Sequence, residues 1–216
     1  MSDSLNDTGA LLRISQWLSP AFPVSAYAYS HGLEAEITTG RVTSGAALRE
    51  WGAGVLRAGA GRSDAILLVA AMEDGADHAA LAALARALAG SADRWEETRD
   101  QGAALSATLA ALGEPTVSGA YPVVLGAAAR GLGLSAEVVA SLFLQAFASN
   151  LVSAAVRFMP LGQAEGQSVL AALRPVIAEV AAEVIGVGLD GLGQAAFGAD
   201  LAAMEHEELE VRIFRT

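Results

Sequence analysis

The sequence contains no cysteine and no lysine. The absence of thiols excludes disulfides, thiolate nucleophiles and cysteine metal sites. All 13 basic residues are arginine, so Schiff-base catalysis and a phosphate-binding loop with its lysine are excluded as well. The opening stretch, MSDSLNDTGA, is polar and acidic and lacks the features of a secretory signal. We therefore expect a cytoplasmic protein.

Basic residues are also scarce, with 13 arginines against 24 acidic residues and a formal net charge of −11. A chain with this charge repels a phosphate backbone, which argues against a nucleic-acid partner. The three histidines, His31, His78 and His206, lie far apart in the sequence and form no metal-binding motif. Gly186–Gly191 matches G-x-G-x-x-G, but it follows a predicted helix rather than a strand. We expect no cofactor, no resident metal and no catalytic residue.

The apolar residues favour an all-α fold. They make up 53% of the chain, enough for a sizeable core, and they recur at helical spacing, as in Leu81, Leu84, Ala85 and Leu88. No linker or repeat marks a domain boundary. The sequence therefore predicts a single domain over residues 1–216, a helical bundle of about ten helices.

Local signals place the ends of these helices. The predicted helices are Gly9–Leu18, Ser30–Thr38, Ser44–Ala58, Ser63–Asp74, Ala76–Ala89, Asp93–Leu112, Tyr121–Gly131, Ala136–Phe158, Gly162–Ile185 and a short one near Asp200–His206. The expected N-terminal caps are Ser63-Asp64, Asp93 and Ser135. The glycines expected to end helices in a left-handed conformation are Gly40, Gly75, Gly90 and Gly113.

One uncharged segment, Val138–Val156, approaches the length of a membrane span. However, Ser141, Gln145, Ser149 and Ser153 recur at every fourth position and form a polar stripe on one helix face. Lipid would leave that stripe poorly satisfied. We therefore interpret the segment as a buried helix of a soluble protein and expect no membrane contact.

Three stretches contain polar and aromatic groups that the helix pattern does not require. The first, SPAFPVSAYAYSHGLE, joins a proline turn to a cluster of aromatic residues and ends at Glu34. The second, DRWEETRDQG, places Glu97 and Arg99 close together on a helix. The third is the tail, defined as residues 208–216, where apolar and arginine side chains follow the acidic run Glu205–Glu210. Arginine and aromatic residues are frequent in protein interfaces.

These stretches resemble the UreF family of urease accessory proteins. SPAFPVSAYAYSHGLE is similar to the family's proline turn and its Tyr-Ser and Gly-Leu-Glu motifs, and WEETRDQG is similar to its Glu-Thr-Arg segment. Tyr121-Pro-Val-Val124, Phe147–Arg157, Pro160-Leu-Gly-Gln163, Met204-Glu-His-Glu207 and Arg212-Ile-Phe-Arg215 resemble further family blocks, in order. The chain departs at Ser25-Ala26, where glycines are common, and at Glu210, where a tyrosine is usual.

The resemblance implies a non-enzymatic, all-α scaffold for urease maturation. It implies a homodimer that joins UreD (UreH in some organisms) and the GTPase UreG, and that helps insert the nickel cation into apo-urease. The partner-binding candidates are Tyr27, Tyr29, Ser30, His31, Glu34, Glu97, Arg99, His206, Arg212, Phe214 and Arg215.

Three alternatives stay open at this stage. The tail is expected to be disordered until it docks on UreD/UreH, or else it folds back onto its own core. The polar groups of the first two stretches either bind a partner or brace the turn internally through hydrogen bonds. The alternative function is that of a small helical enzyme using Glu97, Arg99 and a histidine.

Overall fold

The computed structural model describes residues 2–193 and 195–216, and within them it contains helices and no strands. The α-helices are α1 (Ser2–Trp17), α2 (Leu33–Thr38), α3 (Gly45–Ala58), α4 (Ala60–Ala71), α5 (His78–Leu88), α6 (Ala92–Ala111), α7 (Tyr121–Arg130), α8 (Ala136–Phe158), α9 (Gln163–Val187) and α10 (Phe197–Glu207). Two short 3₁₀ turns cover Ala26–Ala28 and Leu189–Gly191. The predicted all-α class is confirmed.

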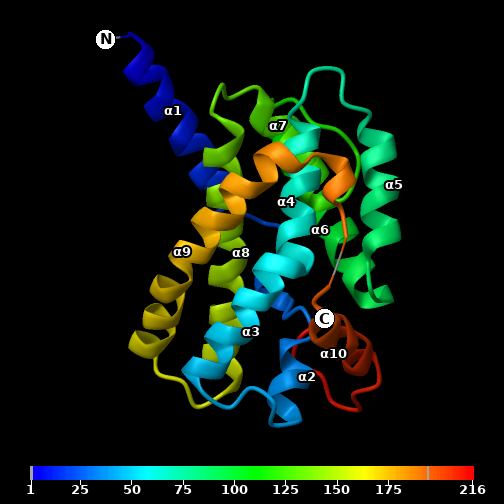
Figure 1. Ribbon diagram of the computed structural model, residues 1–216. Helices are drawn as coiled ribbons and strands as arrows, with labels where there is room; N and C mark the ends of the chain where they lie inside the picture. The colour runs from blue at the N-terminus through cyan, green and yellow to red at the C-terminus, as the bar shows by residue number, and fades with distance from the viewer. Residues whose placement is uncertain (1, 194) are drawn as a thin grey trace.

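Helix α8 lies at the centre of the bundle. It packs along α9 and also contacts α4, α3 and α2. Figure 1 shows α3 and α4 crossing in front of α8, α5 on the outer side, and the N-terminal part of α1 extending away from the other helices. Helix α10 contacts α2 and α6, and in Figure 1 it lies at the lower end of the bundle, beside α2.

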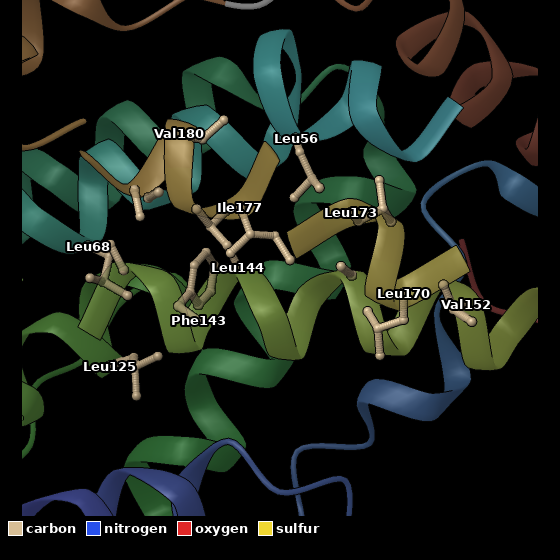
Figure 2. Close-up of a cluster of buried hydrophobic side chains, with 14 of the residues drawn as sticks. Leu56, Leu68, Leu125, Phe143, Leu144, Val152, Leu170, Leu173, Ile177 and Val180 are labelled. Carbon is tan, nitrogen blue, oxygen red and sulfur yellow. The ribbon is translucent and has the colours of Figure 1, made fainter. Parts of the chain in front are cut away.

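Large aliphatic side chains fill the space between these helices. Figure 2 shows Leu144 of α8 facing Ile177 of α9, with Leu56 of α3 and Leu68 of α4 nearby. Leu56, Leu68 and Leu144 are fully buried. Each such side chain contributes roughly 1.5–3 kcal/mol when it is removed from water. The apolar side chains that recur at helical spacing in the sequence therefore pack into one continuous hydrophobic core around α8.

Among the described residues, α8 is the one helix that is long and apolar enough to cross a membrane. Half of its most apolar 18-residue window is buried inside the bundle. The core helix of a soluble protein has the same length and composition as a membrane span. Its packing against α9 and α4 agrees with the interpretation as a core helix.

Several helix starts differ from prediction. Ser135 caps α8 as expected, because its side chain accepts from the Val138 amide. In contrast, α4 begins at Ala60 directly after Gly59, so Ser63-Asp64 is not its cap. Helix α6 is capped by Ser91, since the carboxylate of Asp93 is turned toward other partners.

Helix α2 begins at Leu33 rather than Ser30. His31 (φ 55°) and Gly32 (φ 78°) are both left-handed, and this conformation interrupts the helix. Of the expected left-handed glycines, Gly40, Gly75 and Gly113 have positive φ and Gly90 does not. Gly90 instead lies close to α10, where an added Cβ would meet Asp200 Oδ1 at 3.1 Å.

Two other glycines allow helices to approach backbone to backbone. A Cβ at Gly102 of α6 would lie 2.1 Å from the carbonyl oxygen of Gly119, just before α7. A Cβ at Gly126 of α7 would lie 2.3 Å from the carbonyl oxygen of Leu68 in α4. Any side chain there would force the backbones apart. The contact at Gly102 brings α6, which carries Glu97, close to the start of α7.

Candidate functional site

A buried polar network connects α2, α6, α10 and the tail. Its fully buried side chains are Ser30, Glu34, Glu97, His206 and Thr216. Buried polar groups are stable only when their hydrogen-bonding capacity is satisfied.

Glu34 of α2 is the first centre of the network, at 2% exposure. One of its carboxylate oxygens accepts from the amide of Ile213 at 2.8 Å, and the other accepts from the amide of Phe214 at 2.9 Å. Nε2 of His206 lies 3.0 Å from the second oxygen. One carboxylate thus holds both α10 and the tail.

His206 continues the network on its other side. Its Nδ1 lies 3.2 Å from the carboxylate of Asp93, and the same carboxylate accepts from Nη1 of Arg212 at 3.0 Å. Both ring nitrogens therefore face carboxylates. Helix α10 is linked in this way to α2, to α6 and to the tail.

Glu97 of α6 is the second centre, at 1% exposure. Its first oxygen lies 3.0 Å from His31 Nε2 and accepts from Gln101 Nε2 at 3.0 Å. Its second oxygen accepts from Thr216 Oγ1 at 3.1 Å and lies 3.6 Å from Arg94 Nη1. Burial alone would raise the pKa of Glu97, but His31 and Arg94 outweigh it and lower that pKa below its usual value. The carboxylate is therefore ionised and fully engaged.

The remaining candidates lie around the aromatic segment before α2. Tyr29 is buried, and its phenol oxygen lies 3.5 Å from Nη1 of Arg215. Tyr27 is 60% exposed, and its backbone carbonyl accepts from Arg157 Nη2 at 2.6 Å. The guanidinium of Arg157 also lies 4.8 Å from the ring centre of Phe214. The tail is thus fixed to this segment as well as to α2.

Arg99 lies outside the network. Its side chain is exposed and pairs with the adjacent Asp100, at 2.8 Å between Nη2 and Oδ1. Glu97, two residues earlier, points into the interior. The two residues that the enzyme alternative combined therefore do not share a site.

The tail is folded back onto its own core, and the expectation that it stays disordered until docking is wrong for this structure. Phe214 and Thr216 are buried, the Ser30 amide donates to the Thr216 carbonyl at 2.8 Å, and the Arg215 amide donates to the Ala28 carbonyl at 2.7 Å. The physical reason is that Glu34 and Glu97 require donors that the tail supplies. Docking of the tail's exposed side chains on UreD/UreH stays a prediction.

Sequence reasoning missed several members of the network. Asp93 was predicted to cap α6, and nothing local indicated that it faces His206. Arg94 pairs with Asp64 of α4, and Asn150 of α8 donates to the Tyr29 carbonyl at 3.3 Å. Asp64 and Asn150 lie far in sequence from their partners, so helix periodicity gives no signal for these pairs.

In the described part of the chain, no group of three or more His, Asp or Glu side chains has the arrangement of a metal site. Every oxygen of Glu34 and Glu97 already has a protein donor. The hydrogen bonds of Glu34 and Glu97 hold the tail in one conformation. It thereby fixes which tail side chains face outward.

Comparison with known proteins gives consistent matches. A sequence model of the family described as UreF matches residues 42–174. The chain is 67% identical over 220 residues to the urease accessory protein UreF of Jannaschia sp. (strain CCS1), with 100% of both chains covered. It is 59% identical over 210 residues to the protein of that name from Cereibacter sphaeroides (strain KD131 / KCTC 12085), covering 97% of this chain and 100% of the relative. The similarity to the protein of that name from Paracoccus denitrificans (strain Pd 1222) is 47% over 214 residues, covering 99% of each.

Proposed function

The chain belongs to the UreF family of urease accessory proteins, and we propose that it is a dimeric scaffold that bridges UreD/UreH and the GTPase UreG during the activation of apo-urease. Its role in urease maturation is that of an accessory protein, and it is not the catalytic enzyme. In this proposal it helps insert the nickel cation by positioning its partners. It works in the cytoplasm, without membrane or nucleic acid.

The observation that best supports a docking role is the exposure of two aliphatic side chains on a tail that is itself anchored to the core. Phe214 points inward and is buried, whereas Val211 and Ile213 are 80% and 67% exposed. Because Glu34 holds the amides of Ile213 and Phe214, the tail is rigid where it presents these aliphatic groups to solvent.

Helix α10 adds a second apolar feature. Phe197, Leu201 and Met204 are spaced by four and three residues and lie on one helix face. All three are at least 48% exposed. An apolar helix face exposed to water is typical of a surface that another protein covers. We propose that this face and the tail together contact UreD/UreH.

A different surface is proposed for the remaining partners. Tyr27 and Arg99 are both exposed and are not needed to satisfy the buried network. Exposed aromatic and arginine side chains are the types enriched at interface hot spots. We assign them to contacts with UreG or apo-urease in the proposed complex.

Charge substitutions on the tail test the docking proposal. Val211→Asp and Ile213→Asp place a carboxylate in the proposed contact, so we expect co-purification with UreD/UreH and urease activation to be lost. Ile185→Asp on α9 is a matched control, because Ile185 is also an exposed aliphatic residue, at 43%. Unaltered co-purification of the tail variants would refute the docking surface.

Deletion of residues 211–216 is a poorer test than these substitutions. It removes the buried Phe214 and Thr216, and with them the two tail amides that donate to Glu34 and the hydroxyl that donates to Glu97. We therefore expect the truncated protein to lose stability as well as binding.

A further inference from the structure

A cavity of about 320 Å³ lies beside the buried network and separates α8 from the proline turn and α6. Its inner end is formed by buried residues of the network, including His31 and Glu97, together with Asp64. Its outer rim includes exposed residues such as Tyr27, Ser153 and Gln167. The cavity is therefore open to solvent at one end and polar at the other. Its volume is at the small end of the range for ligand sites, enough for a single long side chain.

One wall of the cavity is aromatic. The rings of Tyr121 and Phe143 have centroids 6.2 Å apart, and those of Phe143 and Phe147 are 6.5 Å apart. All three residues line the cavity. The faces of aromatic rings attract cations and also pack against the methylene groups of long side chains.

The inner end holds a carboxylate that is only partly satisfied. Asp64 Oδ2 pairs with Arg94, while Oδ1 has no partner among the described residues. Burial raises the pKa of Asp64 in spite of Arg94, because the ionised carboxylate is poorly compensated. In contrast, both carboxylate oxygens of Glu97 already have partners, which are His31, Gln101, Thr216 and Arg94. Asp64 is therefore the group at this end that remains available to a donor.

A second polar atom at this end also lacks a partner. Nδ1 of His31 is buried and has no hydrogen-bond partner among the described residues. Its Nε2 lies 3.0 Å from Glu97, so within the described chain Nδ1 is the ring atom without a partner at this end of the cavity. His31 also has a left-handed backbone, at φ 55°. Such strain in a residue other than glycine concentrates at functional positions.

We propose that this cavity binds the guanidinium or ammonium end of a basic side chain presented by a partner protein. Asp64 accepts from the cation, the aromatic wall covers the methylene stem, and the exposed rim contacts the backbone that bears the side chain. The net charge of −11 favours approach of a basic partner. This inference does not depend on the role in urease maturation, because the isolated chain has the whole cavity.

Binding of a blocked amino acid to the purified full chain tests the proposal. The probe is N-acetyl-arginine N-methylamide, and its neutral control is the citrulline analogue, which has the same shape and no charge. An NMR titration follows the side-chain amides of Gln101 and Asn150, both of which line the cavity. We expect saturable chemical-shift changes with the arginine probe. The citrulline probe should bind about tenfold more weakly, because its neutral urea group lacks the positive charge that strengthens a hydrogen bond to Asp64.

Two variants locate the binding. Asp64→Asn removes the charge and is compared with Asp190→Asn, which alters an exposed aspartate outside the cavity. Asp64→Asn also disturbs the ion pair with Arg94. Ser153→Trp is therefore a second, independent test, because it narrows the cavity at the rim and leaves the buried network intact. Its matched control is Ser168→Trp, at an exposed position of α9 that does not line the cavity.

We expect Asp64→Asn and Ser153→Trp each to weaken arginine binding by about tenfold or more, with no change in either control. Equal binding of the citrulline probe, unchanged binding by Ser153→Trp, or the absence of any saturable shift in the wild-type chain would each overturn the proposal. A failure here leaves the tail-docking proposal standing, because Val211 and Ile213 do not line the cavity.

Discussion

Nε2 of His206 lies 3.0 Å from the carboxylate of Glu34, a residue 172 positions earlier in the chain. Both side chains are almost completely buried. The same carboxylate accepts two amides of the tail. This one carboxylate therefore links α2 to both α10 and the tail.

Replacement of Glu34 by alanine should detach the tail. The change leaves His206 and the amides of Ile213 and Phe214 without their acceptor, and breaking a buried pair of this kind costs about 3 kcal/mol. We expect a corresponding loss of unfolding free energy in urea denaturation. Glu50→Ala on α3 is the control, since Glu50 is exposed and outside the network. Equal stability of the two variants would show that the tail contacts contribute little.

Glu97 should make stability depend on pH in the acidic range. Its folded-state pKa is lowered from the ordinary value of 4.5. The ionised carboxylate therefore contributes stability that is fully present above about pH 4.5 and is lost as the pH falls through the folded-state pKa. Glu97→Gln should be less stable than wild type at neutral pH, and the difference should shrink on acidification. Urea unfolding across a pH series measures this, and parallel curves would contradict it.

Alanine substitutions at two helix glycines should change stability in opposite directions, because one glycine lies in a close helix contact and the other has open space around it. Gly102→Ala should destabilise the protein by about 2 kcal/mol or more, because its Cβ would overlap the Gly119 carbonyl. Gly54→Ala on α3 meets no atom within 4 Å and should stabilise by about 0.5–1 kcal/mol through helix propensity. Thermal unfolding followed by circular dichroism compares them, and a change of the same sign in both would argue against the close contact of α6 and α7.

Arg99→Ala tests the proposed outer surface. Its one ion pair is exposed, so the unfolding free energy should change by no more than about 0.5 kcal/mol. Complex formation or urease activation should nevertheless weaken. Arg174→Ala, at another exposed arginine on α9, provides the comparison. If Arg99→Ala loses helix content, or assembles as well as wild type, Arg99 is not a docking residue.

Local sequence patterns predicted the helices more accurately than they predicted their beginnings. For α8 the predicted and observed limits coincide at Ala136–Phe158, because Ser135 and the apolar period are both local signals. The start of α2 was predicted three residues too early. Its position depends on the left-handed His31 and on the pairing of Ser30 with Thr216, a contact between distant parts of the chain.

In the candidate site, too, local sequence features were predictable and contacts between distant parts of the chain were not. Glu34, Glu97 and Phe214 lie in the stretches that the helix pattern does not explain, and His206 was a candidate through the family resemblance. The structure brings all four into contact with the tail or its network. Their partners were not predictable. Asp93 meets His206 across 113 residues, and no periodic pattern encodes a pairing at that separation. Arg99 was grouped with Glu97 by proximity in sequence, although the two lie on different faces of α6.

The tail contacts also have a kinetic consequence. The amide of Phe214 reaches Glu34 across 180 residues, so this hydrogen bond closes one of the longest loops available to the chain. Loop closure on this scale is entropically costly and slow compared with helix formation. During synthesis, α2 and α6 leave the ribosome well before the tail, so Glu34 lacks the amides of Ile213 and Phe214 and Glu97 lacks the hydroxyl of Thr216 in the meantime. The surface formed by Val211 and Ile213 thus becomes available only once every helix beneath it has been made.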